Sequence, residues 1–216
     1  MLLSEKITKK VADIVFCIDC TNAGAIRNCM EFQIIKFVES LNTCNQNNIY
    51  VDWRARVIGY GDIEYNEPVQ NNSEFIHDVD LFRRQLCELE AYSGGDDPES
   101  TLDAICYAAL DSKWRDRCER IIIVLTDAPT KSLHVSTMCK FNIRDFKELM
   151  KALVDNHIRL FLWGETDPIY ESMKQFPKSH ICLWQNAYEY LYTAKLDLTE
   201  YIDKILVVHG CNPYNI

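Results

Sequence analysis

Short apolar segments alternate with polar, helix-like segments along the whole chain. Most of these apolar segments are continuous rather than alternating. This pattern is typical of strands that are covered on both faces. The segments that predict strands are residues 14–18, 56–60, 121–125, 159–163 and 180–184.

Between these segments, apolar residues recur every three or four positions, which predicts helices with one buried stripe. The predicted helices include residues 30–41, 102–110, 146–153 and 195–209, with a weaker one at 79–89. Strands that alternate with helices favour a parallel sheet with helices on both faces. We therefore predict an α/β fold, a Rossmann-like three-layer sandwich whose mostly parallel central sheet has about six strands.

Nothing along the chain suggests a boundary between domains. No Gly/Ser/Pro-rich linker, repeat or low-complexity stretch interrupts the pattern, so residues 1–216 are predicted to form a single domain. The acidic, Asn-rich segment 62–73 is expected to connect the strand at 56–60 to an edge strand or to the next helix.

Composition and charge exclude several classes of protein. The chain is 48% hydrophobic and 25% charged, which suits a globular protein with a proper core. Its formal charge of −9 repels phosphate backbones and anionic lipids, so neither a nucleic acid nor a membrane is an expected partner. A charge pair near the N-terminus precedes any apolar run, and no long apolar stretch follows, so we expect a soluble cytoplasmic protein.

The ten cysteines do not form a recognisable framework. They lie scattered in a chain that is large enough to need no disulfides, which favours reduced, mostly buried thiols. The single CxxC, from Cys17 to Cys20, ends a predicted strand, and strand geometry would point its two thiols to opposite faces. No second CxxC and no closely spaced histidines complete a zinc site.

Candidate chemistry gathers where predicted strands end. Asp19 and Thr21 follow the first strand, Asp127 follows the third, and Asp96 lies in the Gly-Gly-Asp-Asp-Pro-Glu stretch 94–99 before a predicted helix. Because ligands bind at the carboxyl ends of parallel strands, these side chains are expected to meet at one edge. Like charges there require a cation, and oxygen ligands favour Mg²⁺ or Mn²⁺. We therefore predict a metal site of Asp19, Thr21, Asp96 and Asp127.

Two neighbouring aspartates receive other roles. Asp97 is interpreted as a helix cap, with Pro98 as the first helical residue and Glu99 as the second, which leaves Asp96 as the favoured ligand over Asp97. Asp62, which follows the second strand, is predicted to lie at the rim of the site or to support its ligands.

These motifs resemble the von Willebrand factor A domain family, in particular its bacterial and cytoplasmic branch. Family members have a metal-ion-dependent adhesion site, built from an Asp-x-Ser/Thr-x-Ser motif, a Gly-Gly loop and an Asp after the fourth strand. The corresponding residues here are Asp19, Thr21, Asp96 and Asp127. The third ligand position of the first motif, its final serine, falls on Ala23, which has no ligand atom, so weak metal binding or a water in place of the hydroxyl is expected.

The resemblance implies a non-enzymatic interaction module, in which the metal binds an acidic residue of a partner protein. Relatives of this kind work beside ATPases, kinases or phosphatases. Two alternatives remain open: a metal-free, degenerate scaffold of the same fold, and a Mg²⁺-dependent phosphohydrolase. The latter needs a second aspartate two residues after Asp19, where this chain has Thr21.

Overall fold

The computed structural model describes residues 8–43, 49–94, 97–192 and 196–201. Strands and helices alternate along these segments as the sequence predicts. In chain order the elements are β1 (Thr8–Asp19), α1 (Thr21–Thr43), β2 (Ile49–Tyr60), η2 (Ile63–Tyr65), α2 (Val79–Cys87), α3 (Thr101–Leu110), β3 (Glu119–Leu125), α4 (Val135–Phe141), α5 (Phe146–Asp155), β4 (Ile158–Glu165), α6 (Pro168–Met173), β5 (Ser179–Trp184), α7 (Ala187–Tyr192) and η3 (Leu198–Tyr201).

The described strands form one parallel sheet in the order β2-β1-β3-β4-β5. The predicted α/β architecture is confirmed, but the prediction of about six strands is corrected to five. The outer edge of β2 is covered by residues 70–76, which form two isolated antiparallel bridges, Gly59 with Gln70 and Ala55 with Ile76. This segment satisfies backbone groups that an open edge strand would leave unpaired.

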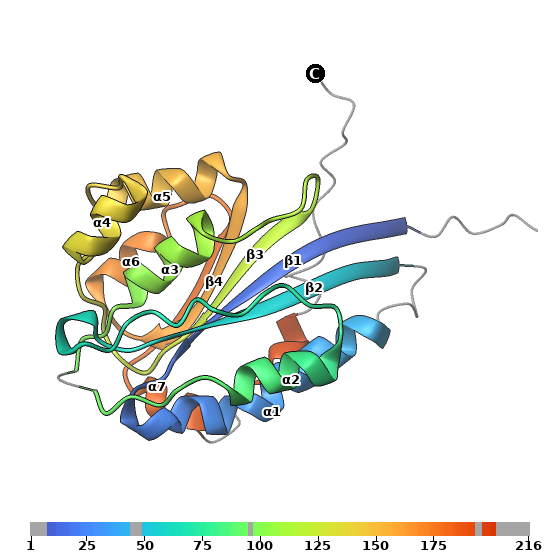
Figure 1. Ribbon diagram of the computed structural model, residues 1–216, viewed down its shortest axis with the longest axis horizontal. Coiled ribbons are helices and arrows are strands. Elements are labelled where there is room, and N and C mark those ends of the chain that lie inside the picture. The colour runs from blue at the N-terminus through green and yellow to red at the C-terminus, as the bar shows by residue number, and fades with distance from the viewer. Residues whose placement is uncertain (1–7, 44–48, 95–96, 193–195, 202–216) are drawn as a thin grey trace, which may run out of the picture.

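Helices cover both faces of the sheet, so the molecule has three layers (Figure 1). On one face, alternate β1 residues Ile14, Phe16 and Ile18 pack against α1, α2, α7 and η3. On the other face, Val15 and Cys17 pack against α3, and the cluster extends to α4, α5 and α6. The period of two along β1 thus supplies two cores from one strand.

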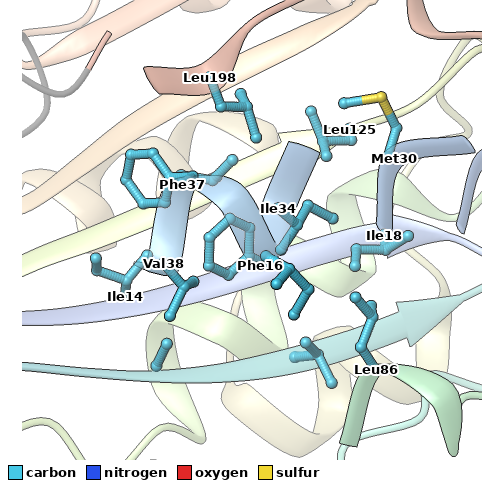
Figure 2. Packing of buried hydrophobic residues seen from close by; sticks show 14 of the residues in the cluster. Ile14, Phe16, Ile18, Met30, Ile34, Phe37, Val38, Leu86, Leu125 and Leu198 are labelled. Atoms are coloured by element: carbon cyan, nitrogen blue, oxygen red, sulfur yellow. The ribbon is translucent and has the colours of Figure 1, made fainter. Parts of the chain in front are cut away.

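The first core shows why α1 forms as the sequence predicts. Its apolar residues recur along one stripe that points at the sheet, and the labelled members interlock with β1, α2 and η3 (Figure 2). Burial of each large side chain contributes about 2 kcal/mol. The buried residues of this stripe are Met30, Ile34, Phe37, Val38 and Leu41.

Several predicted boundaries are corrected by the structure. β1 and β2 begin well before the apolar segments, α4 and α6 were not predicted, and α3 begins at Thr101 with Ser100 as its N-cap. Asp97, Pro98 and Glu99 therefore precede the helix rather than starting it. Most of the predicted helix 195–209 lies outside the described residues, of which Leu198–Tyr201 forms a 3-10 helix.

A buried ion network explains how the polar beginnings of β1 and β2 enter the sheet. Asp13 is fully buried, and its carboxylate accepts hydrogen bonds from Arg54 and Arg115 at 2.7–2.8 Å. Arg115 also donates to Asp52 at 2.8 Å. Burial raises the pKa of Asp13, but the two arginines outweigh it and hold that pKa below its usual value. These charges neutralise one another in space although they lie far apart in sequence.

Cys17 and Cys20 belong to the cores on opposite faces of the sheet, as predicted. The expectation of mostly buried thiols is too strong, because Cys87 and Cys139 are exposed. Within the described ranges, every helix is too short or too polar to span a lipid bilayer.

Candidate functional site

The sheet order creates a switch point between β1 and β3. From β1 the chain crosses to β2 on one side, whereas from β3 it crosses to β4 on the other side. The loops that follow β1 and β3 therefore diverge at the carboxyl ends of the strands, which is where open α/β sheets bind ligands. Asp19 ends β1, and Thr126 and Asp127 directly follow β3.

Asp19 is held by hydroxyl and amide donors from both strand ends. Its Oδ1 accepts hydrogen bonds from the Thr21 backbone N–H at 3.0 Å and from the Thr21 hydroxyl at 2.7 Å. Its Oδ2 accepts from the Thr126 hydroxyl at 3.0 Å. The carboxylate is only 1% exposed. These neutral donors fix its orientation, but they supply no positive charge to balance it.

Glu99 enters the same region from the loop before α3. Its backbone is fixed to the loop after β3, because its N–H donates to Pro129 O at 2.9 Å and its carbonyl accepts from Lys131 N at 2.8 Å. The side chain is 2% exposed, and its Oε2 has no hydrogen-bond partner among the described residues. A buried carboxylate oxygen without a donor requires a proton or a cation.

A third carboxylate, Glu67, reaches the same region from the loop after β2. Its Oε1 accepts from Gly94 N at 3.0 Å, and its Oε2 accepts from Asp62 N at 3.2 Å. Gly61 has no room for a side chain, since a Cβ there would lie 2.6 Å from Glu67 Oε2 and 2.6 Å from the Tyr92 ring. Glu67 thereby connects the loop after β2 to the Gly-Gly loop.

Asp62 has a different environment from the one the sequence suggested. Its side chain is fully buried and forms an ion pair with Lys131 at 2.5 Å, and Lys131 also pairs with Glu64 at 2.9 Å. The charge of Asp62 is already neutralised by a lysine of the loop after β3.

Burial and neighbouring negative charge raise the pKa values of Glu99, Asp127 and Asp19. Burial and the nearby charge of Asp19 raise the pKa of Glu99 to about 9. The same two causes raise the pKa of Asp127 to about 6. Burial also raises the pKa of Asp19, against the opposing hydrogen bonds from Thr21 and Thr126. Raised carboxyl pKa values of this kind are typical of functional sites, where a bound cation can neutralise the carboxylates.

A layer of hydroxyl groups lies beneath this acidic site. Thr101 donates to Tyr60 Oη at 3.3 Å, and Tyr170 donates to Thr101 Oγ1 at 2.9 Å. All three side chains are fully buried. Burial raises the pKa of both tyrosines well above the usual value, so they remain neutral donors. This layer of hydroxyl groups, the hydroxyl floor of the site, connects α3 and α6 to the end of β2.

The predicted metal ligands have different outcomes. Asp19 and Thr21 meet in a hydrogen bond, and Asp127 lies close enough to Asp19 for its pKa to respond to that charge. Asp96 lies outside the described residues, whereas Asp97 is exposed. Within 8–43, 49–94, 97–192 and 196–201, no three His, Cys, Asp or Glu side chains are grouped as metal ligands.

The donor set nevertheless fits a magnesium ion chemically. Mg²⁺ keeps several waters and needs only one or two carboxylates, which Asp19 and Asp127 can supply, with a hydroxyl oxygen from Thr21. The unpartnered Oε2 of Glu99 shows that the edge has acceptor capacity which protein donors leave unused. Hard oxygen ligands and excess negative charge are the properties that such an ion requires.

The sequence analysis missed Glu67 and Glu99 as members of this site. Glu99 was assigned to a helix, although the helix begins two residues later, and Glu67 lies in a loop without a motif. The sequence signal available for Glu67 was its place in the loop that follows the end of β2, a few residues after Gly61-Asp62. For Glu99 it was Ser100, because serine is favoured at an N-cap about as much as aspartate is.

Comparison with known proteins identifies the fold family. The family model described as von Willebrand factor A domain matches residues 14–159, from β1 to the start of β4, and this range includes all the predicted metal ligands as well as Asp62, Glu67 and Glu99. A search of curated proteins finds no significant match.

Proposed function

We propose, because the chain belongs to the von Willebrand factor A domain family, that it is a non-enzymatic protein–protein interaction module that uses a divalent metal ion. The proposed ligands are Asp19, Thr21, Asp96 and Asp127, and the ion is Mg²⁺ or Mn²⁺. When bound, the ion supplies an open coordination position for an acidic residue of the partner protein. An ATPase, kinase or phosphatase is the class of partner that the family resemblance suggests.

The observation that supports this proposal most directly is the group of buried carboxyl groups at the switch point that no described basic residue neutralises. Within the described chain, Asp19 and Glu99 have no ion-pair partner, and the cation of the neighbouring loop, Lys131, pairs with Asp62 and Glu64. Charges buried in this way cost several kcal/mol unless something neutralises them. A bound cation would remove that cost and stabilise the folded state.

The chain's own residues would orient the ion and its partner. The Thr21 and Thr126 hydroxyls hold the Asp19 carboxylate in one rotamer. The hydroxyl floor of Tyr60, Thr101 and Tyr170 keeps the strand ends fixed. A carboxylate that is already oriented loses little entropy when it binds a ligand.

A metal-free scaffold of the same fold is the second candidate. The observations that favour it are the alanine at position 23 and the lack of a grouped three-ligand set in the described residues. In that case the raised pKa values mean that protons, rather than a metal ion, neutralise the acidic edge at neutral pH.

Calorimetric titration with Mg²⁺ and with Mn²⁺ tests the proposal. We expect saturable binding to the wild type in the millimolar range or tighter, and its loss in Asp19→Ala and Asp127→Asn. Asp97→Asn is the matched control, because it removes the same charge from the neighbouring loop at an exposed position. Lack of binding heat at millimolar metal would favour the metal-free scaffold.

The interaction itself needs a separate measurement. Affinity capture from native lysate with immobilised wild type should retain a partner in Mg²⁺ and release it in EDTA. Asp127→Ala should retain none under either condition, whereas Asp97→Asn should behave as the wild type. Equal capture of the same protein in excess EDTA would contradict the role of a metal in binding.

A further inference from the structure

A polar pocket lies on the outer flank of the sheet, on the α3 side of β2. It has a volume of about 300 Å³. Arg54 and Arg56 point into it from alternate positions of β2, and the covering segment 70–76 forms its opposite wall. The remaining lining residues are Asn71, Asn72, Ser73, Glu74, Phe75, Asp111 and Lys113.

Arg56 is the unusual residue of this pocket. Its side chain is 5% exposed, yet it forms no ion pair with a described carboxylate. Nη2 donates to Asn71 Oδ1 at 2.5 Å and to Asn71 O at 3.4 Å, Nη1 makes a long contact of 3.5 Å to Ser112 Oγ, and Nε has no acceptor. A buried guanidinium whose hydrogen-bond acceptors are all neutral is costly, because the nearby carboxylates of Asp111 and Glu74 attract it without forming an ion pair.

The other charges of the pocket already have partners. Arg54 donates to the buried carboxylate of Asp13 at 2.7–2.8 Å. Asp111 pairs with Lys140 at 2.8 Å, outside the pocket. Lys113 and Glu74 face each other at 3.7 Å, both largely exposed. When these pairs are set aside, the charge that remains in the pocket is the positive charge of Arg56.

The pocket also offers uncharged groups that suit an organic ligand. The amide side chain of Asn72 and the face of Phe75 line it, and the Phe75 ring lies 4.4 Å from the Arg54 guanidinium and 5.9 Å from that of Arg56. A volume of this size lies at the lower end of small-molecule sites. It therefore has room for more than a single inorganic ion.

We propose that this pocket binds a small organic oxyanion, a phosphate ester or a carboxylate, through the guanidinium of Arg56. The anion would accept from the Arg56 nitrogen atoms that have weak or missing acceptors, and the exposed ammonium of Lys113 would lie at its rim. Such charge-assisted hydrogen bonds are about twice as strong as neutral ones. The pocket lies along β2 before the strand reaches its carboxyl end, so the proposal does not depend on the metal site.

The test uses inorganic phosphate, phenyl phosphate and acetate as probes, in chloride buffers of equal ionic strength that contain EDTA. Thermal unfolding and calorimetric titration of the wild type should show saturable stabilisation by at least one probe. Arg56→Gln should weaken that binding about tenfold or more, which is the effect of losing one charge-assisted interaction. A preference for phenyl phosphate over acetate would identify a phosphate ester as the ligand class, and the reverse a carboxylate.

Arg144→Gln is the matched control, since Arg144 is an exposed arginine of the loop before α5 and its loss changes the net charge equally. It should bind the probes as the wild type does. Lys113→Gln alters an exposed side chain and leaves the fold intact, so it keeps the test valid if Arg56→Gln is unstable; it should weaken binding by a few-fold. Absence of saturable binding to the wild type, or equal binding by Arg56→Gln, would overturn the proposal.

Discussion

The substitution Glu99→Gln should stabilise the protein, and it should do so more at neutral than at acidic pH. The pKa of Glu99 is raised from its ordinary 4.5 to about 9, because its carboxyl group is buried and lies near Asp19. The folded protein therefore keeps this proton up to about pH 9, whereas the unfolded chain releases it above about pH 4.5. Stability is lost as the pH rises between these two values.

The magnitude follows from the interval between the two pKa values. At pH 7.5 the solution is three pH units above the pKa of Glu99 in the unfolded chain. Each unit lowers the free energy of unfolding by about 1.4 kcal/mol, so the total cost to stability is up to about 4 kcal/mol. At pH 5.0 the same cost is below about 1 kcal/mol. Glutamine has no such proton to retain, so its stabilising effect should be larger by about 3 kcal/mol at the higher pH.

Denaturant unfolding at pH 5.0 and pH 7.5, in the presence of EDTA, measures this difference. Glu90→Gln is the control, because Glu90 is an exposed glutamate that loses the same charge. Its two unfolding curves should follow those of the wild type. Equal destabilisation by Glu99→Gln at both pH values would refute the argument, since it would mean that Glu99 makes a structural hydrogen bond rather than retaining a proton.

Three further substitutions or measurements test the surroundings of the site. Gly61→Ala should lower the free energy of unfolding by about 1–3 kcal/mol, measured with denaturant, because its Cβ would lie 2.6 Å from the carboxylate of Glu67. Asp13→Asn should cost about 3–5 kcal/mol at pH 7, since two arginines lose their partner, and the difference from wild type should vanish as the pH falls below the depressed pKa of Asp13. Cys17, whose pKa is raised to about 12 by burial, should resist a thiol reagent at pH 8 in the native state, whereas the exposed Cys139 should react at once; modification mapped by mass spectrometry distinguishes them.

Hydrophobic patterning predicted a segment of each described strand, because parallel strands buried on two faces tolerate few polar residues. It failed at the beginnings of β1 and β2, where Asp13, Asp52 and Arg54 are charged. These residues enter the sheet because Arg115, about a hundred positions after Asp13, completes their ion network. A single sequence does not show such a pairing, so the charges looked like the ends of strands.

The candidate site was predicted in outline and missed in detail for a related reason. Asp19 and Asp127 lie at strand ends, a position that topology alone assigns to one edge. The position of Glu99 depends instead on where α3 begins. Because the helix begins at Thr101, Glu99 lies in the loop before it and not on the helix. The ion pair of Asp62 with Lys131 depends on loop conformation, which spacing along the chain does not determine.

Short helices were the other omission, although one of them had a usable signal. Asp167 caps α6 through hydrogen bonds to the N–H groups of Ile169 and Tyr170, and Pro168 occupies the first turn. An Asp-Pro pair of this kind is a recognised start signal. Six residues, however, are too few to show an apolar period, so the signal lacked the pattern that would have supported it.

The distribution of buried charge distinguishes structural from unsatisfied groups more clearly than the total of −9 does. Asp13 shows that this fold can match a buried carboxylate with arginines when the charge has a structural role. Within the described residues, the same matching is missing for Asp19 and Glu99 at the strand ends and for Arg56 on the outer strand. Apolar residues of similar volume would avoid both costs. A ligand of opposite charge would therefore stabilise the fold most at these two places, a cation at the first and an oxyanion at the second.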